Sequence, residues 1–120
     1  LVLGGGGFIG RNIVEFLINR GNCNVTAADI KEGSNWSAIA KNESLSRRFK
    51  SITADFTDIT AFDDLDKRFD EVYMLAAVVG VNRTIKAPQD VIRINTLLTM
   101  NTLDSPSSFV ASAVDIDYDR

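Results

Sequence analysis

The sequence predicts an α/β protein built on an open, doubly wound parallel sheet with the strand order 3-2-1-4-5. Two observations carry this prediction. Short runs of β-forming residues alternate with segments of helical periodicity along nearly the whole chain, and the first run ends in four consecutive glycines. Because parallel strands are joined by right-handed crossovers, this alternation places helices on both faces of the sheet. A ligand is then expected outside the carboxyl ends of the strands.

The first unit is a strand, a glycine turn and a helix. Residues 1–3 are apolar β-formers, and the glycines after them permit a sharp turn out of a buried strand. A helix is expected after Gly10, because apolar residues recur there at helical spacing. They give the helix one broad apolar face, made of Ile13, Val14, Phe16, Leu17 and Ile18.

The later elements continue the alternation. The fourth strand is apolar throughout, which is typical of a central parallel strand buried on both faces. The last helix begins near Pro88 and is apolar enough to pack on a sheet. We expect strands at residues 25–30, 51–54, 71–77 and 109–111, one broken helix over 37–41 and 45–49, and helices over 59–69 and 90–104.

The glycine cluster also has the features of a Rossmann-type dinucleotide site. Its spacing fits both Gly5-x-Gly7-x-x-Gly10 and Gly4-x-x-Gly7-x-x-Gly10, and spacing alone does not choose between them. Glycines let the backbone approach a pyrophosphate, and the helix N-terminus offers unpaired N–H groups and a positive dipole end. Asp29 ends the second strand, where a carboxylate can accept hydrogen bonds from ribose hydroxyls. The alternative is an ordinary flexible turn.

Composition excludes several classes of function. The net charge of −3 and a pI near 4.8 disfavour a nucleic-acid surface. The longest apolar stretch, residues 72–81, is shorter than the roughly 20 residues that a membrane span needs. Cys23 is the single cysteine, so we expect a packing or loop residue, and the lack of histidine excludes a thiol–imidazole pair. No metal site is predicted.

The segment from Gly4 to Gly10, with Phe8 and Ile9 between its last two glycines, resembles the glycine motif of the extended short-chain dehydrogenase/reductase family. Within that family it is similar to the nucleotide-sugar epimerase and dehydratase branch, and the resemblance covers about residues 1–103. It implies NAD as the cofactor, with Asp29 as the ribose-binding acid. NAD is preferred to NADP, because the carboxylate would repel a 2′-phosphate.

Asp55 resembles the family's adenine contact, in which a carboxylate accepts from the exocyclic amine beside the backbone N–H of Phe56. An ordinary turn aspartate is the alternative. Asn95 is similar to an asparagine that helps to place the active-site backbone, in the pattern Asn95-x5-Asn101-x-Leu103, and simple polarity of the helix surface is its alternative.

Leu75, Ala76 and Ala77 resemble the segment that passes under the dinucleotide, where small side chains leave room for the cofactor. Ordinary strand packing is the alternative. Residues 80–83 occupy the loop where such enzymes begin to meet the sugar nucleotide. Arg83 there could contact a phosphate or be a simple surface arginine.

The family's Tyr-x-x-x-Lys pair, in which lysine lowers the pKa of the phenol so that tyrosinate can remove a hydroxyl proton, is missing from this sequence. Tyr73 is followed four positions later by Ala77, and Tyr118 lies two residues from the end. Ser112 lies near the position of the family's catalytic serine or threonine, with an ordinary strand-end serine as the alternative.

We therefore expect residues 1–120 to be an incomplete NAD-binding domain of a cytoplasmic nucleotide-sugar epimerase or dehydratase, with the substrate-binding part elsewhere. The abrupt connection from Leu103 to Phe109 indicates either a deletion or the joining of pieces of a longer chain, and we favour the second. The family implies a homodimer through a four-helix interface, for which the helix after Pro88 is a candidate, although its pattern also suits packing on the sheet. A non-catalytic dinucleotide-binding regulator is the alternative function, and a nucleic-acid-binding relative is disfavoured by the acidic charge.

Overall fold

The computed structural model describes residues 1–31, 36–66 and 68–105, and it confirms the α/β class. Its four described strands form one parallel sheet in the order β3-β2-β1-β4, as predicted. The expected fifth strand at 109–111 lies outside the described residues. The elements are β1 (Val2–Leu3), α1 (Phe8–Arg20), β2 (Val25–Asp29), α2 (Ser37–Ala40), α3 (Glu43–Ser46), β3 (Phe49–Thr53), the 3-10 helix η1 (Ile59–Asp64), β4 (Tyr73–Met74), α4 (Val81–Lys86) and α5 (Pro88–Asp104).

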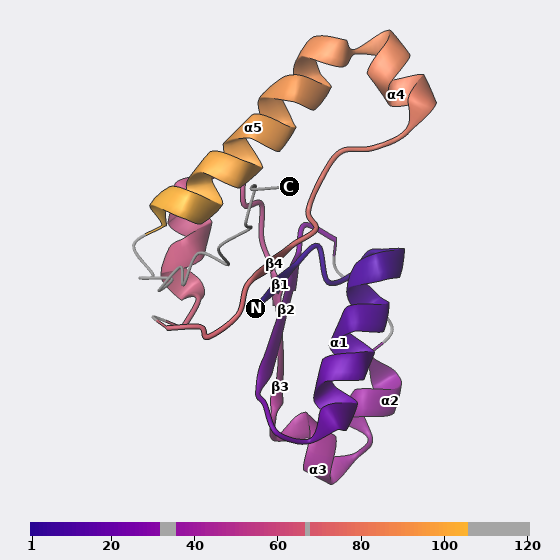
Figure 1. Cartoon of the computed structure of the whole chain (residues 1–120), viewed down its shortest axis with the longest axis vertical. Helices are drawn as coiled ribbons and strands as arrows, with labels where there is room; N and C mark the ends of the chain where they lie inside the picture. Colours follow the sequence, from indigo (N-terminus) through magenta and orange to yellow (C-terminus); the bar gives the residue numbers. More distant parts are fainter. Residues whose placement is uncertain (32–35, 67, 106–120) are drawn as a thin grey trace, which may run out of the picture.

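The molecule has three layers. Figure 1 shows α1, α2 and α3 on one side of the sheet, with α5 and the 59–64 segment on the other. Successive strand residues point to opposite faces, so Val2 and Ala27 pack toward α1 whereas Leu3 and Ala28 pack toward α5. Two cores result: Val2, Val14, Leu17, Ile18, Val25, Ala27 and Ile39 on one face, and Leu1, Leu3, Ala28, Phe56, Phe62, Leu65 and Leu98 on the other.

The first helix, the helix expected over 59–69 and the segment 80–83 differ from their predicted form, and local geometry explains the first two. Helix α1 begins at Phe8 rather than after Gly10, because Gly7 is its N-cap and accepts the first helical bond, from the N–H of Arg11, at 2.9 Å. The helix expected over 59–69 is the short η1, and extended backbone at Leu65 carries that side chain into the core. The segment 80–83 was expected as a loop, but α4 begins at Val81.

The fourth strand is shorter and less buried than its apolar sequence predicts. Only Tyr73 and Met74 pair with β1, and both are half-buried. The reason lies in β1, which ends when Gly4 turns the chain away with a φ of +81°. Beyond Met74 the N–H of Leu75 still donates to the Leu3 carbonyl at 2.8 Å, and the chain then passes beside the glycine turn.

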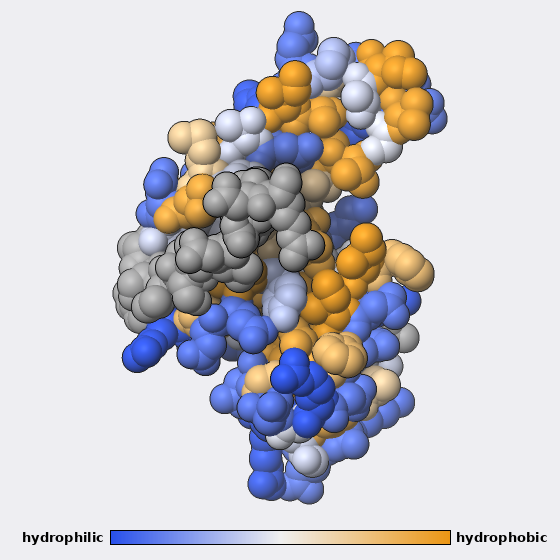
Figure 2. Space-filling model, in the orientation of Figure 1, coloured by the Kyte–Doolittle hydropathy of each residue, from blue (hydrophilic) through white to orange (hydrophobic). Residues whose placement is uncertain are grey.

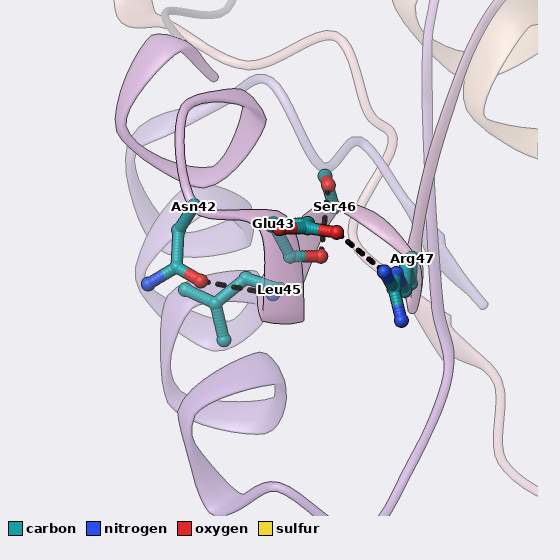
Figure 3. Close-up of polar contacts among 5 residues, drawn as sticks. All are labelled: Asn42, Glu43, Leu45, Ser46 and Arg47. Atoms are coloured by element: carbon teal, nitrogen blue, oxygen red, sulfur yellow. Dashed lines mark hydrogen bonds and ion pairs between the residues drawn. The ribbon is translucent and has the colours of Figure 1, made fainter.

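The broken helix is two separate helices, and Asn42 sets the break. Its Oδ1 accepts from the Leu45 N–H at 3.2 Å, which makes Asn42 the N-cap of α3 (Figure 3). In the same turn Glu43 forms an ion pair with Arg47. Phe49, expected at the end of this helix, instead starts β3.

The carboxyl end of α1 is held by Arg48 from the start of β3. The Arg48 guanidinium donates to the Ile18 carbonyl through both terminal nitrogens at 3.2 Å and to the Cys23 carbonyl at 3.1 Å. Cys23 is half-buried, and its thiol donates to the Leu17 carbonyl, so it is the packing residue that was expected. Arg48 therefore ties α1 to the far edge of the sheet.

Among the described ranges, no helix combines the length and apolar character needed to cross a bilayer.

Candidate dinucleotide site

Three of the glycines after β1, Gly4, Gly5 and Gly10, have no room for a side chain. Gly4 has a φ of +81°, and a Cβ placed on it would lie 2.6 Å from the backbone nitrogen of Ala76. A Cβ on Gly10 would overlap the Gly4 carbonyl oxygen and lie 2.8 Å from the Gly5 Cα. The first turn of α1 is thereby pressed against the glycine turn. A Cβ on Gly5 would likewise lie 2.9 Å from the Cβ of Ala27, so packing requires glycine at both Gly4 and Gly5 and fits both spacing patterns.

Gly7 differs from its neighbours. It is exposed, its φ is −72°, and a Cβ there would touch only the Gly4 carbonyl oxygen, at 3.4 Å. Neither backbone conformation nor protein packing therefore requires glycine at this position. With glycine at position 7, the space before the N-terminus of α1 holds no side chain from this residue.

The N-terminus of α1 is open to an anion. The first helical bond is that of Arg11, so the N–H groups of Phe8, Ile9 and Gly10 precede the helical ladder. The helix has no side-chain cap and no acidic residue in its first turn. The side chains of Phe8 and Ile9 are 81% and 63% exposed beside it.

Asp29 connects the second strand to the glycine turn. Its Oδ2 accepts from the Gly6 N–H at 3.0 Å, and its Oδ1 accepts from the Lys31 N–H at 3.1 Å. The structure thus brings together a carboxylate and a glycine that lie 23 positions apart. The carboxylate is fixed at the carboxyl end of β2, beside the turn, as the fingerprint spacing predicts.

Asp55 and Phe56 follow β3. The Oδ1 of Asp55 accepts from both the N–H and the hydroxyl of Thr57, at 3.0 and 2.7 Å, so Asp55 does form a local turn. Its side chain is exposed, whereas the Phe56 ring is buried edge-on against Phe62, with ring centroids 5.0 Å apart. Phe56 therefore anchors the loop in the core and leaves the carboxylate at the surface.

The segment after β4 runs directly behind the glycine turn. The backbone of Ala76 is the closest neighbour of Gly4, and Leu75 and Ala77 are exposed beside it. Asn95 of α5 holds the next residue: its Oδ1 accepts from the Val78 N–H at 2.7 Å, and its Nδ2 donates to the Val78 carbonyl at 3.0 Å. Because Asn95 is half-buried and bonds this backbone twice, simple surface polarity does not describe it.

Two contacts escaped the sequence prediction. The bond from Gly6 to Asp29 depends on the fold of the turn, which no spacing rule describes. The second is Asn101, whose Nδ2 donates to the carbonyls of Phe56 and Thr57 at 3.1 and 2.8 Å. Asn101 stands in the same Asn95-x5-Asn101 pattern that pointed to Asn95, and that pattern was the available signal.

Neither a Tyr-x-x-x-Lys pair nor a metal centre occurs among the described residues. Tyr73 donates its hydroxyl to the Glu71 carboxylate at 2.7 Å, and this bond raises the pKa of the phenol above its usual value. Arg83 lies exposed on α4. In residues 1–31, 36–66 and 68–105 no three His, Cys, Asp or Glu side chains gather to hold a metal ion. Ser112 lies outside these ranges.

Sequence and structure comparisons relate the chain to known proteins. The sequence model of the NAD dependent epimerase/dehydratase family matches residues 1–109. A UDP-N-acetyl-alpha-D-glucosaminuronate decarboxylase from Bacillus cytotoxicus is 29% identical over 105 residues, which are 88% of this chain and 32% of that protein. A solved structure described as an apo SCOR enzyme from Clostridium thermocellum shares the fold, with a TM-score of 0.50 and 19% identity over 88% of this chain and 47% of its own. The chain thus spans about a third of the length of its curated relative.

Proposed function

Because the chain belongs to the NAD-dependent epimerase/dehydratase family, we propose that it is the NAD-binding part of an enzyme that transiently oxidises a hydroxyl of a nucleotide sugar. The predicted cofactor, NAD, is that of the family. The observation that carries the proposal is the junction of the glycine turn, the open N-terminus of α1 and the Asp29 carboxylate. The sugar-nucleotide class is drawn from the curated relative.

In this proposal the pyrophosphate lies in front of Gly7, against the N–H groups of Phe8, Ile9 and Gly10. The helix dipole favours its charge, and the backbone can come close because Gly7 carries no side chain. Asp29 accepts from the ribose hydroxyls. Each carboxylate oxygen has a second lone pair, so the bonds from Gly6 and Lys31 leave acceptor capacity.

The same proposal gives roles to the flanking loops. Asp55 accepts from the adenine amine beside the Phe56 N–H. Leu75, Ala76 and Ala77 pass under the dinucleotide, and Asn95 positions the backbone at Val78 next to them. Each role agrees with where the residue lies: these loops follow β3 and β4 at the carboxyl ends of the strands, where doubly wound sheets bind ligands.

The chemistry that NAD supplies is acceptance of a hydride from the sugar carbon. The accompanying hydroxyl proton needs a base, and no Tyr-x-x-x-Lys pair occurs in this sequence. We propose that the base is provided by a part of the enzyme beyond this segment, with Ser112 hydrogen-bonding the reacting oxygen. A cytoplasmic location is part of the same proposal, because both nucleotide sugars and NAD are present in the cytoplasm.

We also propose a homodimer formed through α5. This helix packs Ile94 and Leu98 against the sheet and leaves Ile92, Met100 and Leu103 exposed on another face. Together with Val81 and Ile85 of α4 they give the apolar surface that Figure 2 shows over these two helices. A helix with an apolar face on each side suits both sheet packing and a four-helix interface.

Turnover by the full-length protein tests the proposal. The protein is incubated with UDP- and other nucleotide sugars while NADH absorbance and product structure are followed. We expect transient NADH or an epimerised, dehydrated or decarboxylated product. The alternative is a non-catalytic dinucleotide-binding regulator, which would have the same fold but no Tyr-x-x-x-Lys pair in the full-length protein. NAD binding without any turnover, in a full-length protein that lacks this pair, would decide for the regulator.

A further inference from the structure

Asn101, in the last turn of α5, holds the loop that follows β3. Its single Nδ2 atom donates to two consecutive carbonyls, those of Phe56 at 3.1 Å and Thr57 at 2.8 Å. The partners lie 45 and 44 positions earlier in the chain. Asn95 of the same helix also reaches a distant loop, 17 positions away, whereas the amides of Asn12 and Asn19 donate to carbonyls four residues back in their own helix.

The loop that Asn101 holds is otherwise fixed by local contacts. Asp55 accepts twice from Thr57, so two hydrogen bonds tie the Asp55 carboxylate to the Thr57 backbone and hydroxyl. The Phe56 side chain is 3% exposed and packs against Phe62 in the core that contains Leu98 of α5. The Asn101 amide therefore restrains the backbone on the carboxyl side of Phe56. The Phe56 ring restrains the same backbone by packing in the core.

We propose that Asn101 is a positioning residue for adenine recognition, acting through the backbone at Phe56 and Thr57. Adenine presents its exocyclic amine as a donor beside the ring nitrogen N1 as an acceptor. A site that reads this pair needs a carboxylate and an N–H at one fixed separation, which is what the restrained Asp55–Phe56 turn offers. The inference rests on the proposed function, which assigns the adenine to Asp55 and Phe56.

Helix α5 then serves both loops at the carboxyl edge of the sheet. Asn95 holds Val78 after β4, and Asn101 holds Phe56 and Thr57 after β3. In the described sheet β3 and β4 are the two outer strands, so one helix sets the position of loops on either side of the glycine turn. In the proposed site, Asn95 thus acts on the segment that passes under the dinucleotide, and Asn101 acts on the loop that contacts the adenine.

The test compares NAD with nicotinamide hypoxanthine dinucleotide, in which a carbonyl replaces the adenine amine and N1 becomes a donor. Affinities of both are measured by calorimetry on the full-length parent, Asn101→Ala and Asn19→Ala. Asn19→Ala is the matched control, because it also removes an amide from the last turn of a helix, but this amide donates to Glu15 of its own helix. We expect the parent to prefer NAD, and Asn101→Ala to reduce that preference by roughly 3–10-fold, the worth of a well-placed hydrogen bond.

The ratio of the affinities for NAD and for the hypoxanthine dinucleotide distinguishes a positioning role of Asn101 from a loss of protein stability. A variant that is merely less stable loses affinity for both dinucleotides and keeps the ratio, as Asn19→Ala should. An unchanged ratio in folded Asn101→Ala overturns the inference and leaves the proposed function standing, whereas a parent that binds neither dinucleotide overturns both. A parent that binds both equally has no adenine preference to position, which also overturns the inference. If Asn101→Ala does not fold, Asn101→Gln keeps a donor but displaces it, and an intermediate ratio is expected.

Discussion

At the scale of single residues, the glycines of the turn have two different reasons to lack a side chain: packing within the protein and space for the proposed ligand. Gly10 is required by the protein itself, because a Cβ there would meet the backbone of Gly4 and Gly5. Gly7 has an ordinary φ and room for a Cβ, so only the proposed pyrophosphate would require glycine there. Substitutions at the two positions should therefore have different consequences.

Gly10→Ala should destabilise the protein by about 1–3 kcal/mol, the usual range for overpacking, because backbone atoms must move to admit the methyl group. Gly7→Val should change the unfolding midpoint little but weaken NAD binding by about tenfold or more, which corresponds to about 1.4 kcal/mol. Urea unfolding and calorimetry on the full-length protein measure the two effects. A folded Gly7→Val variant with parental NAD affinity would remove the pyrophosphate assignment.

Asp29→Asn should narrow the preference for NAD over NADP. The amide keeps an oxygen for the Gly6 N–H but loses the charge that repels a 2′-phosphate and strengthens the bond to the ribose. We expect NAD affinity to fall by about tenfold, the worth of a hydrogen bond to a charged group, while NADP affinity rises or stays constant. Asp58→Asn, which changes another exposed turn carboxylate, serves as the control. Tighter binding of NADP by the parent would contradict the assignment.

At the scale of elements, two adjacent arginines show how differently a charge can act. Arg48 is half-buried and donates to carbonyls at the end of α1, where the helix dipole also favours a cation. Arg47 is exposed and pairs only with Glu43 one turn earlier. Arg48 therefore joins α1 to the sheet, whereas Arg47 forms a surface ion pair within α3 and its C-cap.

Arg48→Ala should lower the free energy of unfolding by about 1.5–3 kcal/mol, since charged hydrogen bonds to α1 are lost. Arg47→Ala, the matched control one position away, should cost no more than about 0.5 kcal/mol, as exposed helix pairs do. Chemical unfolding of both variants checks the difference. Equal effects would mean that the Arg48 contacts contribute nothing beyond an exposed pair.

At the scale of the whole molecule, α5 has two roles on two faces. Leu98 packs in the core beside Phe62, while Ile92, Met100 and Leu103 face outward. Its amides hold the loops at the carboxyl edge of the sheet. Dimerisation through α5 would therefore place an interface directly behind the backbone that shapes the site.

The double variant Ile92→Glu and Leu103→Glu should convert a dimer of the full-length protein into a monomer without unfolding it, because both side chains are exposed in the single chain. Phe16→Glu is the matched control, a similar change at an exposed apolar side chain of α1. Light scattering after size exclusion reports the mass. A monomeric parent, or a double variant that stays dimeric, would exclude this interface.

The sequence by itself determined the α/β class, the strand order through β4 and the closeness of Asp29 to the glycine turn. These follow from local patterns: apolar periodicity, glycines that turn the chain, and a carboxylate at a strand end. The tertiary structure alone decided which side chains form hydrogen bonds to segments far away in the sequence. Arg48 caps a helix 30 positions earlier, and Asn101 holds a loop 45 positions earlier. The tertiary structure also made β4 shorter than predicted, because its partner β1 ends at Gly4. The sequence of β4 contains no information about where β1 ends.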